Sequence, residues 1–252
     1  MLIWNTLPKT DQAGAEVVVG EPDFATTTGG CGPATLMVPE GAFVYGNKLI
    51  IGDTGNDRVL IYNSIPTSPG ASPDLVLGQD SLTTCAADDD AQTGSSTTTP
   101  TARTLRGPIG VWTEGTRLVV ADGGNGRVLI WDTFPDHDFQ PADVVVGQAN
   151  RTSANTSSVS DSTMNEAYYV ASNGTQLFAS DSGNNRVLVW DAFPTQNGAP
   201  ATTVLGQQDF TSHAGVFPPT ASTLANPSGL LLTGNELLVA DTSTSRVVVF
   251  RP

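Results

Sequence analysis

Three oxygen-bearing side chains stand in comparable segments of this sequence, each shortly before or at the start of a run of strand-forming residues. They are Glu40, Glu166 and Asn226. Carboxylate and amide oxygens are the ligands of hard cations, and Ca²⁺ takes about six to eight of them. If these side chains meet in the fold, we expect them to bind Ca²⁺ or another divalent metal. The alternative is a polar, hydrated surface.

Two further residues could move a proton at such a site. Tyr169 follows Glu166 closely, and His213 lies in a long polar loop. A histidine titrates near neutral pH and can act as a general base, although a lone loop histidine is more often simply solvated. The sequence lacks G-x-S-x-G and H-E-x-x-H, so the familiar nucleophile and zinc signatures are missing. The acidic run at residues 88–90 lacks the spacing of a calcium loop, and we expect it to be a solvated insertion.

These candidate residues lie in a sequence that repeats along the chain. One phrase occurs four times, and a shortened copy opens the chain: GDTGNDRVLIYNSIP (52–66), ADGGNGRVLIWDTFP (121–135), SDSGNNRVLVWDAFP (180–194), ADTSTSRVVVFRP (240–252) and MLIWNTLP (1–8). A second phrase follows the earlier copies, as in ADVVVGQ (142–148). A repeat of this length that is rich in strand-forming residues is typical of a radial or solenoid architecture.

One repeat divides into four short strands. Between residues 105 and 148 we predict strands at 109–113, 117–121, 127–132 and 143–147, separated by turns, and no helical period. Four antiparallel strands joined by hairpins form one blade of a β-propeller. The prediction is an all-β single domain over 1–252, with repeats at about 22–79, 80–148, 149–207 and 208–252 plus 1–21.

The ring needs a way to close. The last repeat supplies three strands, and residues 16–20 carry a fourth-strand phrase. We expect this phrase to pair with residues 247–250, which would give a closed ring of four blades and bury two strand edges. Residues 2–4 are then surplus. The alternatives are a fifth half-blade, an open ring, or two chains that complete one ring.

The repeat also predicts where the candidate residues lie. First strands of a propeller line its central channel, so the segments before them lie at the channel mouth. In the third repeat, the Pro and Gly of this segment are replaced over residues 167–169. We expect five side chains to converge at the mouth, on the face of the long loops: Glu40, Arg106, Glu166, Tyr169 and Asn226.

Residues that recur in every repeat have a structural explanation instead. Asp53, Asp122, Asp181 and Asp241 each follow a strand, where an aspartate caps the turn, and we expect each to pair with the arginine of its own or an adjacent blade. The aromatic residues of the third strands are predicted to pack between blades: Trp4, Tyr62, Trp131, Trp190 and Phe250.

Composition limits the possible partners. The formal charge is −14 with 11 Lys and Arg, which argues against a nucleic-acid partner. No apolar run approaches the roughly 20 residues of a membrane span. The two cysteines, Cys31 and Cys85, occupy comparable loops of successive repeats. They predict a disulfide and an oxidising compartment, or else two free thiols.

The start of the chain lacks the features of a signal peptide and falls inside a repeat phrase. We expect a trimmed or truncated chain whose parent protein is secreted, at the cell surface or periplasmic.

The phrase (A/S)D-x-G-N-x-R-V-L-(I/V)-W, preceded by P-x-G, resembles the NHL-repeat β-propeller family over nearly the whole chain. The tail D-(L/V)-V-(L/V)-G-Q is similar to long-repeat NHL-like proteins of bacteria. The resemblance implies the fold and hardly any activity, and relatives usually close with six blades. Similar propellers of the paraoxonase and gluconolactonase types hold a channel metal with Glu, Asn and Asp and hydrolyse lactones and esters.

Three functions follow as hypotheses. The first is a scaffold that binds a small molecule or a protein through its long-loop face, as a monomer or as a homodimer that completes the ring. The second is a metal-dependent hydrolase of lactones, aryl esters or phosphotriesters, with Glu166 and Asn226 as ligands and His213 as base. The third is a structural module of a larger surface protein.

Overall fold

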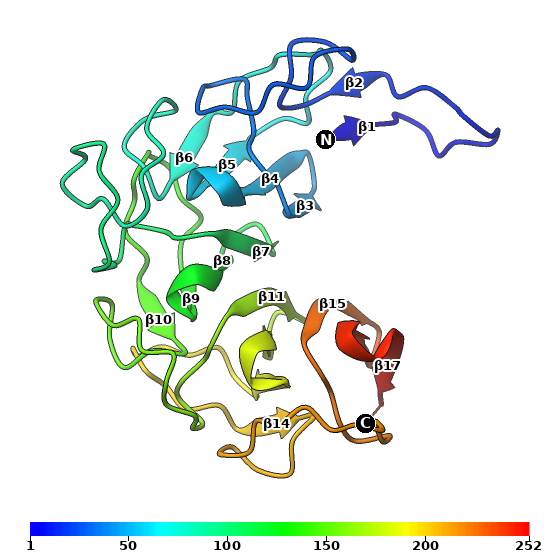
Figure 1. Ribbon diagram of the computed structural model, residues 1–252. Helices are drawn as coiled ribbons and strands as arrows, with labels where there is room; N and C mark the ends of the chain where they lie inside the picture. The colour runs from blue at the N-terminus through cyan, green and yellow to red at the C-terminus, as the bar shows by residue number, and fades with distance from the viewer. Residues whose placement is uncertain (252) are drawn as a thin grey trace.

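The computed structural model describes residues 1–251 and shows short antiparallel sheets set side by side along an arc (Figure 1). Three sheets have four strands each. Their strands are, in chain order, β3 (Gly41–Tyr45), β4 (Lys48–Asp53), β5 (Arg58–Tyr62) and β6 (Leu75–Leu77); β7 (Pro108–Thr113), β8 (Leu118–Asp122), β9 (Arg127–Trp131) and β10 (Val144–Val146); and β11 (Ala167–Ser172), β12 (Leu177–Asp181), β13 (Arg186–Trp190) and β14 (Thr203–Leu205).

The two ends of the arc are smaller sheets. The C-terminal one has three strands, β15 (Pro227–Thr233), β16 (Glu236–Asp241) and β17 (Arg246–Phe250), and we call it the terminal blade. The N-terminal one pairs β1 (Leu2–Ile3) with β2 (Val17–Val18). The predicted all-β propeller of four blades is confirmed, and each strand predicted for residues 105–148 overlaps an observed one.

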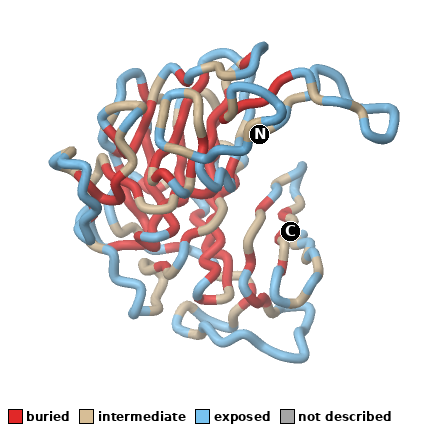
Figure 2. The backbone as a smooth tube through the Cα atoms, turned by 45° about the horizontal axis from the view of Figure 1, so that its top comes forward, coloured by how far each residue is buried: buried red, intermediate tan, exposed pale blue. Residues whose placement is uncertain are grey.

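The repeated phrase sets the local structure of every blade. After each second strand comes a short 3-10 helix: η1 (Thr54–Asn56), η2 (Gly123–Asn125), η3 (Ser182–Asn184) and η4 (Thr242–Thr244). The next residue is left-handed in each case, with φ between 53° and 57°, which suits the Gly, Asn, Asp or Ser found there. The third strands of the first three blades are buried along their whole length (Figure 2).

The first strands of neighbouring blades pack backbone against backbone. A Cβ on Gly41 would collide with the carbonyl oxygen of Ile109, and one on Gly110 would lie 2.6 Å from the Cα of Tyr169. Close approach therefore requires the Gly of the P-x-G phrase in the second blade, Gly110, and the Gly41 at the equivalent place in the first. In the third blade, where Tyr169 stands at this position, the Ser180 hydroxyl accepts the Tyr169 N–H at 2.7 Å and donates to the carbonyl of Ser228 at 2.9 Å.

The expected pairing between residues 16–20 and 247–250 is wrong. β2 pairs with β1, in the register Leu2↔Val18 and Ile3↔Val17, and β17 forms an edge of the terminal blade. The physical reason is proximity, because a hairpin closes a shorter loop than a contact across the whole chain. The segment thought to be surplus is thus a strand, and the arrangement is the open ring with an additional half-blade.

The half-blade packs against the first full blade. Val17 and Val19 belong to the same apolar cluster as Leu36, Leu49 and Tyr62. The two cysteines lie next to this end of the arc. Cys31, in the loop before β3, is bonded to Cys85, in the loop after β6, with an S–S distance of 1.97 Å. This is the pairing expected from their equivalent loop positions.

Within residues 1–251 there is no helix with the length and apolar character needed to cross a membrane.

Candidate functional site

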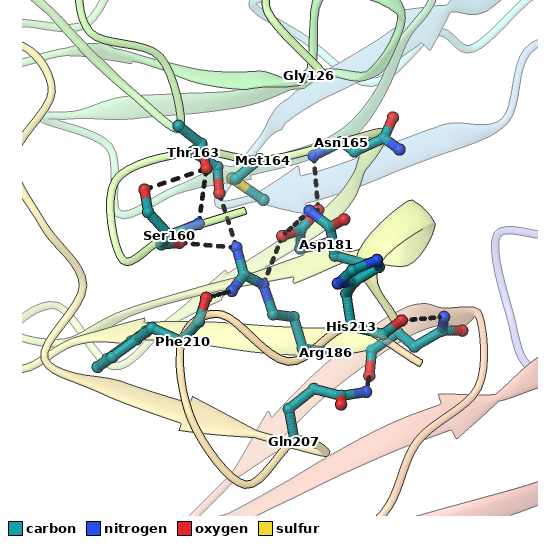
Figure 3. A network of polar contacts seen from close by, with 12 residues as sticks. Gly126, Ser160, Thr163, Met164, Asn165, Asp181, Arg186, Gln207, Phe210 and His213 are labelled. Carbon is teal, nitrogen blue, oxygen red and sulfur yellow. Dashed lines mark hydrogen bonds and ion pairs between the residues drawn. The ribbon is translucent and has the colours of Figure 1, made fainter. Parts of the chain in front are cut away.

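The structure contains two networks of polar side chains, and the first of them recurs in each blade. In the third blade, Asp181 Oδ2 accepts Arg186 Nε at 2.7 Å, and Asp181 Oδ1 accepts the backbone N–H of Asn165 at 2.7 Å (Figure 3). The guanidinium also donates to three carbonyl oxygens, those of Phe210, Ser160 and Thr163, at 2.5, 2.8 and 2.8 Å. All of these groups brace the loops before β11 and after β14.

The same pairing recurs in the other blades, which confirms the structural role predicted for the repeated aspartates. Arg58 with Asp53 and Arg127 with Asp122 are fully buried pairs at 2.8 and 2.7 Å. The predicted packing role of the third-strand aromatics holds for the three inner ones, which are buried: Tyr62, Trp131 and Trp190.

Two recurring side-chain amides belong to this network and were not predicted from the sequence. The Asn of each G-N-x-R phrase donates its Nδ2 to the aspartate, as Asn125 does to Asp122 at 2.9 Å. The Gln of each V-x-G-Q phrase donates to backbone carbonyls, as Gln148 does to Gly126 and Asn155 at 3.0 Å. Their recurrence in the repeated phrases is the sequence feature that could have indicated their role.

The acidic insertion differs from its expected state. Residues 88–90 were predicted to be a solvated run, yet Asp88 and Asp89 are 1% and 2% exposed. Asp88 accepts Arg106 Nε at 2.9 Å and Asn125 Nδ2 at 2.9 Å. The prediction is wrong because these donors compensate the desolvation of the carboxylate. As a result, the charge of Arg106 is neutralised by Asp88.

The second network lies where the first strands β3 and β11 begin, at the place predicted for the channel mouth. The Tyr168 hydroxyl donates to Glu40 Oε2 at 3.0 Å, from the third blade to the first. Burial raises the pKa of Tyr168, and the hydrogen bond to Glu40 and the charges of Glu40 and Glu166 raise it further. Burial and the charge of Glu40 also raise the pKa of Tyr169. Four side chains therefore share one electrostatic environment, and Tyr168 was not among those predicted.

The predicted metal ligands differ in the contacts that they make. Glu40 and Glu166 lie near Tyr168, whereas the contact found for Asn226 is a backbone N–H donated to Asn185 Oδ1 at 2.8 Å. In the described chain no three His, Cys, Asp or Glu side chains are grouped so that they could hold a metal ion. A metal bound by Glu40, Glu166 and Asn226 therefore stays a prediction.

His213 is exposed on its loop (Figure 3). Its Nδ1 lies 3.3 Å from the carbonyl oxygen of Thr211, and its own carbonyl accepts Asn185 Nδ2 at 2.9 Å. Over residues 1–251, no carboxylate forms an ion pair with its ring. A catalytic role for His213, or for Tyr169, stays a prediction.

An apolar groove adjoins the mouth. It has a volume of about 420 Å³ and is lined from β3, β7, β11 and β15 by residues that include Phe43, Trp112, Tyr169 and Leu231. This volume is in the range of small-molecule sites. Leu231 is 59% exposed, so the groove presents apolar surface to solvent. Tyr169 joins it to the mouth, because this side chain lines the groove and senses the charge of Glu40.

The long loops between blades are ordered by their own side chains. Asp209 Oδ1 accepts the backbone N–H groups of Thr211 and Ser212 at 2.9 and 2.8 Å and the Thr211 hydroxyl at 2.8 Å. The Thr211 hydroxyl and these N–H groups lower the pKa of Asp209 below its usual range. Asp23 and Asn150 begin equivalent loops in the same way. The loops are thus held in defined shapes.

No protein-family model matches the sequence, and no curated protein matches it. Among solved structures, the chain is similar to the computationally designed Ika4 protein, with 9% identity and a TM-score of 0.46 over 95% of this chain and 99% of that one. It is also similar to a candidate 6-phosphogluconolactonase of Bacteroides uniformis, with 15% identity and a TM-score of 0.48 over 90% of this chain and 55% of that one.

A third similar structure is the Myceliophteria thermophila Cps50 (Swd1) β-propeller domain, with 15% identity and a TM-score of 0.41 over 84% of this chain and 50% of that one. The chain thus spans about half the length of the last two proteins. All three TM-scores lie below 0.5, so no statement about activity follows from them.

Proposed function

We propose that this β-propeller is a binding scaffold that takes a small molecule in its groove, with the mouth and the long-loop face around the entrance. The observation that carries the proposal is the apolar groove lined by the first strands, whose lining residue Tyr169 directly follows Tyr168, the residue bonded to Glu40 at the mouth. Apolar walls with a few convergent polar groups are the usual make-up of a ligand site. The likeness of the repeated phrase to NHL repeats fits a scaffold of this kind.

Binding is favoured over hydrolysis by the arrangement of the candidate residues. Hydrolysis at the mouth would need a metal ligand set, or a base oriented by a third group. Asn226 contacts Asn185 through its backbone, and His213 contacts backbone carbonyl and amide groups of its surroundings. Elemental analysis of the purified protein after dialysis against metal-free buffer tests the hydrolase hypothesis directly.

The groove can be tested with a matched pair of variants. Leu231 lines the groove and is 59% exposed, whereas Val247 is 61% exposed on β17 and is not among the groove residues. Both Leu231→Gln and Val247→Gln should fold, because each replaces a solvent-facing side chain. We expect small apolar fragments, screened by NMR, to bind the wild type and Val247→Gln alike and to lose affinity for Leu231→Gln.

Equal binding to both variants would place the fragments elsewhere and would refute the groove as the ligand site.

A further inference from the structure

We propose that the groove takes an organic cation, namely an ammonium or guanidinium group on a small apolar body. This inference rests on the proposed function, since it names the ligand class of that groove. Two features of the site support it. One is the negative charge at the mouth that no basic side chain compensates, and the other is the group of aromatic residues in the groove lining, which includes Tyr169.

The negative charge comes from Glu40 and Glu166. Among the ion pairs of residues 1–251, neither carboxylate has a basic partner. Arg106, which the sequence placed at this mouth, is bound to Asp88 at 2.9 Å. A cationic ligand would therefore meet charges that the protein itself does not neutralise.

Few basic side chains elsewhere in the molecule remain to neutralise Glu40 and Glu166. Of the 11 Lys and Arg residues, eight arginines already form ion pairs: Arg58, Arg103, Arg106, Arg117, Arg127, Arg186, Arg246 and Arg251. The net charge of −14 therefore leaves a negative potential that attracts cations and repels anions.

The Glu40 carboxylate is oriented by a hydrogen bond and can accept another from a ligand. Tyr168 donates to Glu40 Oε2 at 3.0 Å, which orients the carboxylate across the mouth. In the part of the chain that the structure describes, this is the hydrogen bond found for the Glu40 side chain. Its other oxygen, Oε1, is therefore available to accept a bond from an N–H donor.

The wall of the groove suits the same ligand. Its lining includes the aromatic residues Phe43, Trp112 and Tyr169, next to leucine and valine side chains. A cation near an aromatic face is attracted by the negative charge of the ring face, even at an exposed site. An alcohol of the same shape would keep the apolar contacts and lose the interactions with the ring faces and the carboxylates.

The test compares three probes of equal length by isothermal titration calorimetry: 4-phenylbutylamine, 4-phenylbutan-1-ol and 4-phenylbutyrate. We expect the amine to bind about tenfold more tightly than the alcohol, and the carboxylate to bind most weakly. The amine should also bind more weakly as the ionic strength rises from low salt to 0.5 M. Dissolved salt screens the attraction between the ammonium group and the carboxylates, and at about 0.1 M the screening length is already only roughly 10 Å. The alcohol should not bind more weakly.

Charge-removing variants locate the effect. Glu40→Gln keeps an acceptor for Tyr168, and Glu166→Gln changes an exposed side chain. We expect each variant to weaken amine binding about threefold, and both together about tenfold, with alcohol binding unchanged. Asp11→Asn is the control, because it removes the same charge in the loop that projects from β1 and β2 (Figure 1).

The outcomes separate the two proposals. If the amine and the alcohol bind equally and the Gln variants have no effect, the groove is a ligand site but the cation assignment is wrong. If Asp11→Asn weakens amine binding as much as the mouth variants do, the affinity depends only on the net charge of the protein, and the cation assignment is also wrong. If none of the probes binds, both proposals fail. If acetyl-Gly-Lys-Gly-amide binds more tightly than the amine, the ligand is a peptide and not a small molecule.

Discussion

The third blade and the terminal blade carry nearly the same phrase and differ in how much of it is buried. In β13 every residue is buried, whereas in β17 no residue is, and Val247 and Val249 are 61% and 36% exposed. The third blade is covered on both faces by its neighbours, and the terminal blade on one. Burial in this fold is therefore a property of neighbouring blades rather than of the phrase itself, as in other repeat proteins.

The repeated ion pair shows the same difference. The Arg186 side chain is fully buried and donates to three carbonyl groups besides Asp181. The Arg246 side chain is 28% exposed and donates to one carbonyl, that of Thr223, besides Asp241. One sequence motif thus gives a closed network inside the arc and a partial one at its end.

The largest expected effect comes from removing one arginine of each kind. Arg127→Ala leaves the buried Asp122 without its counter-charge, and we expect a loss of about 4 kcal/mol in the free energy of unfolding. Arg246→Ala should lose about 1.5 kcal/mol, because that pair is partly screened by water. Urea denaturation followed by circular dichroism measures both, and equal losses would contradict the comparison.

The disulfide tests the other end of the arc. The Cys31–Cys85 bond spans 54 residues, so replacing both cysteines by serine should lower the free energy of unfolding by about 3 kcal/mol. Dithiothreitol should lower the melting temperature of the wild type and leave that of the variant unchanged. A melting temperature insensitive to the reductant in both proteins would mean that the bond does not stabilise this end.

A matched pair of valines isolates burial alone. Val189 on β13 and Val249 on β17 occupy the same register position, opposite Phe178 and Leu238, and are 4% and 36% exposed. Val189→Ala should lose about 2 kcal/mol and Val249→Ala about 0.5 kcal/mol. Equilibrium unfolding of the two variants gives the difference, and a greater loss at Val249 would show that β17 is covered in solution.

The smallest effect concerns a contact between the first two blades. Asp57 accepts the backbone N–H of Gly107 at 2.8 Å, and burial followed by the charges of Asp122 and Asp88 raises its pKa to about 6. Since the folded state holds this proton more tightly than the unfolded state does, stability should fall as the pH rises from about 4 to about 6.

Asp57→Asn introduces the residue that the third blade has at the equivalent position, Asn185. Above pH 6 the variant should be more stable than the wild type by about 1 kcal/mol, a value reduced from the full shift because Asp57 is partly exposed. Near pH 4 the difference should vanish. Thermal melts at both pH values measure this, and a gain that persists at pH 4 would exclude titration of Asp57 as its cause.

Much of the fold could be predicted because the same residues recur. The apolar runs gave the strands, and the recurrent Asp and Arg gave the ion pairs, since a residue repeated in every blade must have a role common to all blades. The pairing of β1 with β2 was missed because strand phrases show which segments are strands and do not show which two pair.

The site was less predictable for a different reason. Glu40 and Glu166 do meet near one tyrosine, as the repeat geometry suggested, but that tyrosine is Tyr168, the neighbour of the residue chosen. The ion pair of Arg106 was not predicted because Asp88, which binds it, lies in an insertion without a counterpart in the other repeats. Contacts that occur once leave no periodic trace in a sequence.

The buried arginines also bear on how such a chain can evolve. Arg127 binds the carbonyl of Thr104, where the chain enters its blade, and that of Arg151, where the chain leaves it. A tandem duplication of one repeat therefore inherits both partners wherever its break points fall. The spacing between successive arginines, 69, 59 and 60 residues, shows that loop length can drift while these ties persist. Recombination between copies can then add or remove blades without any new contact having to arise.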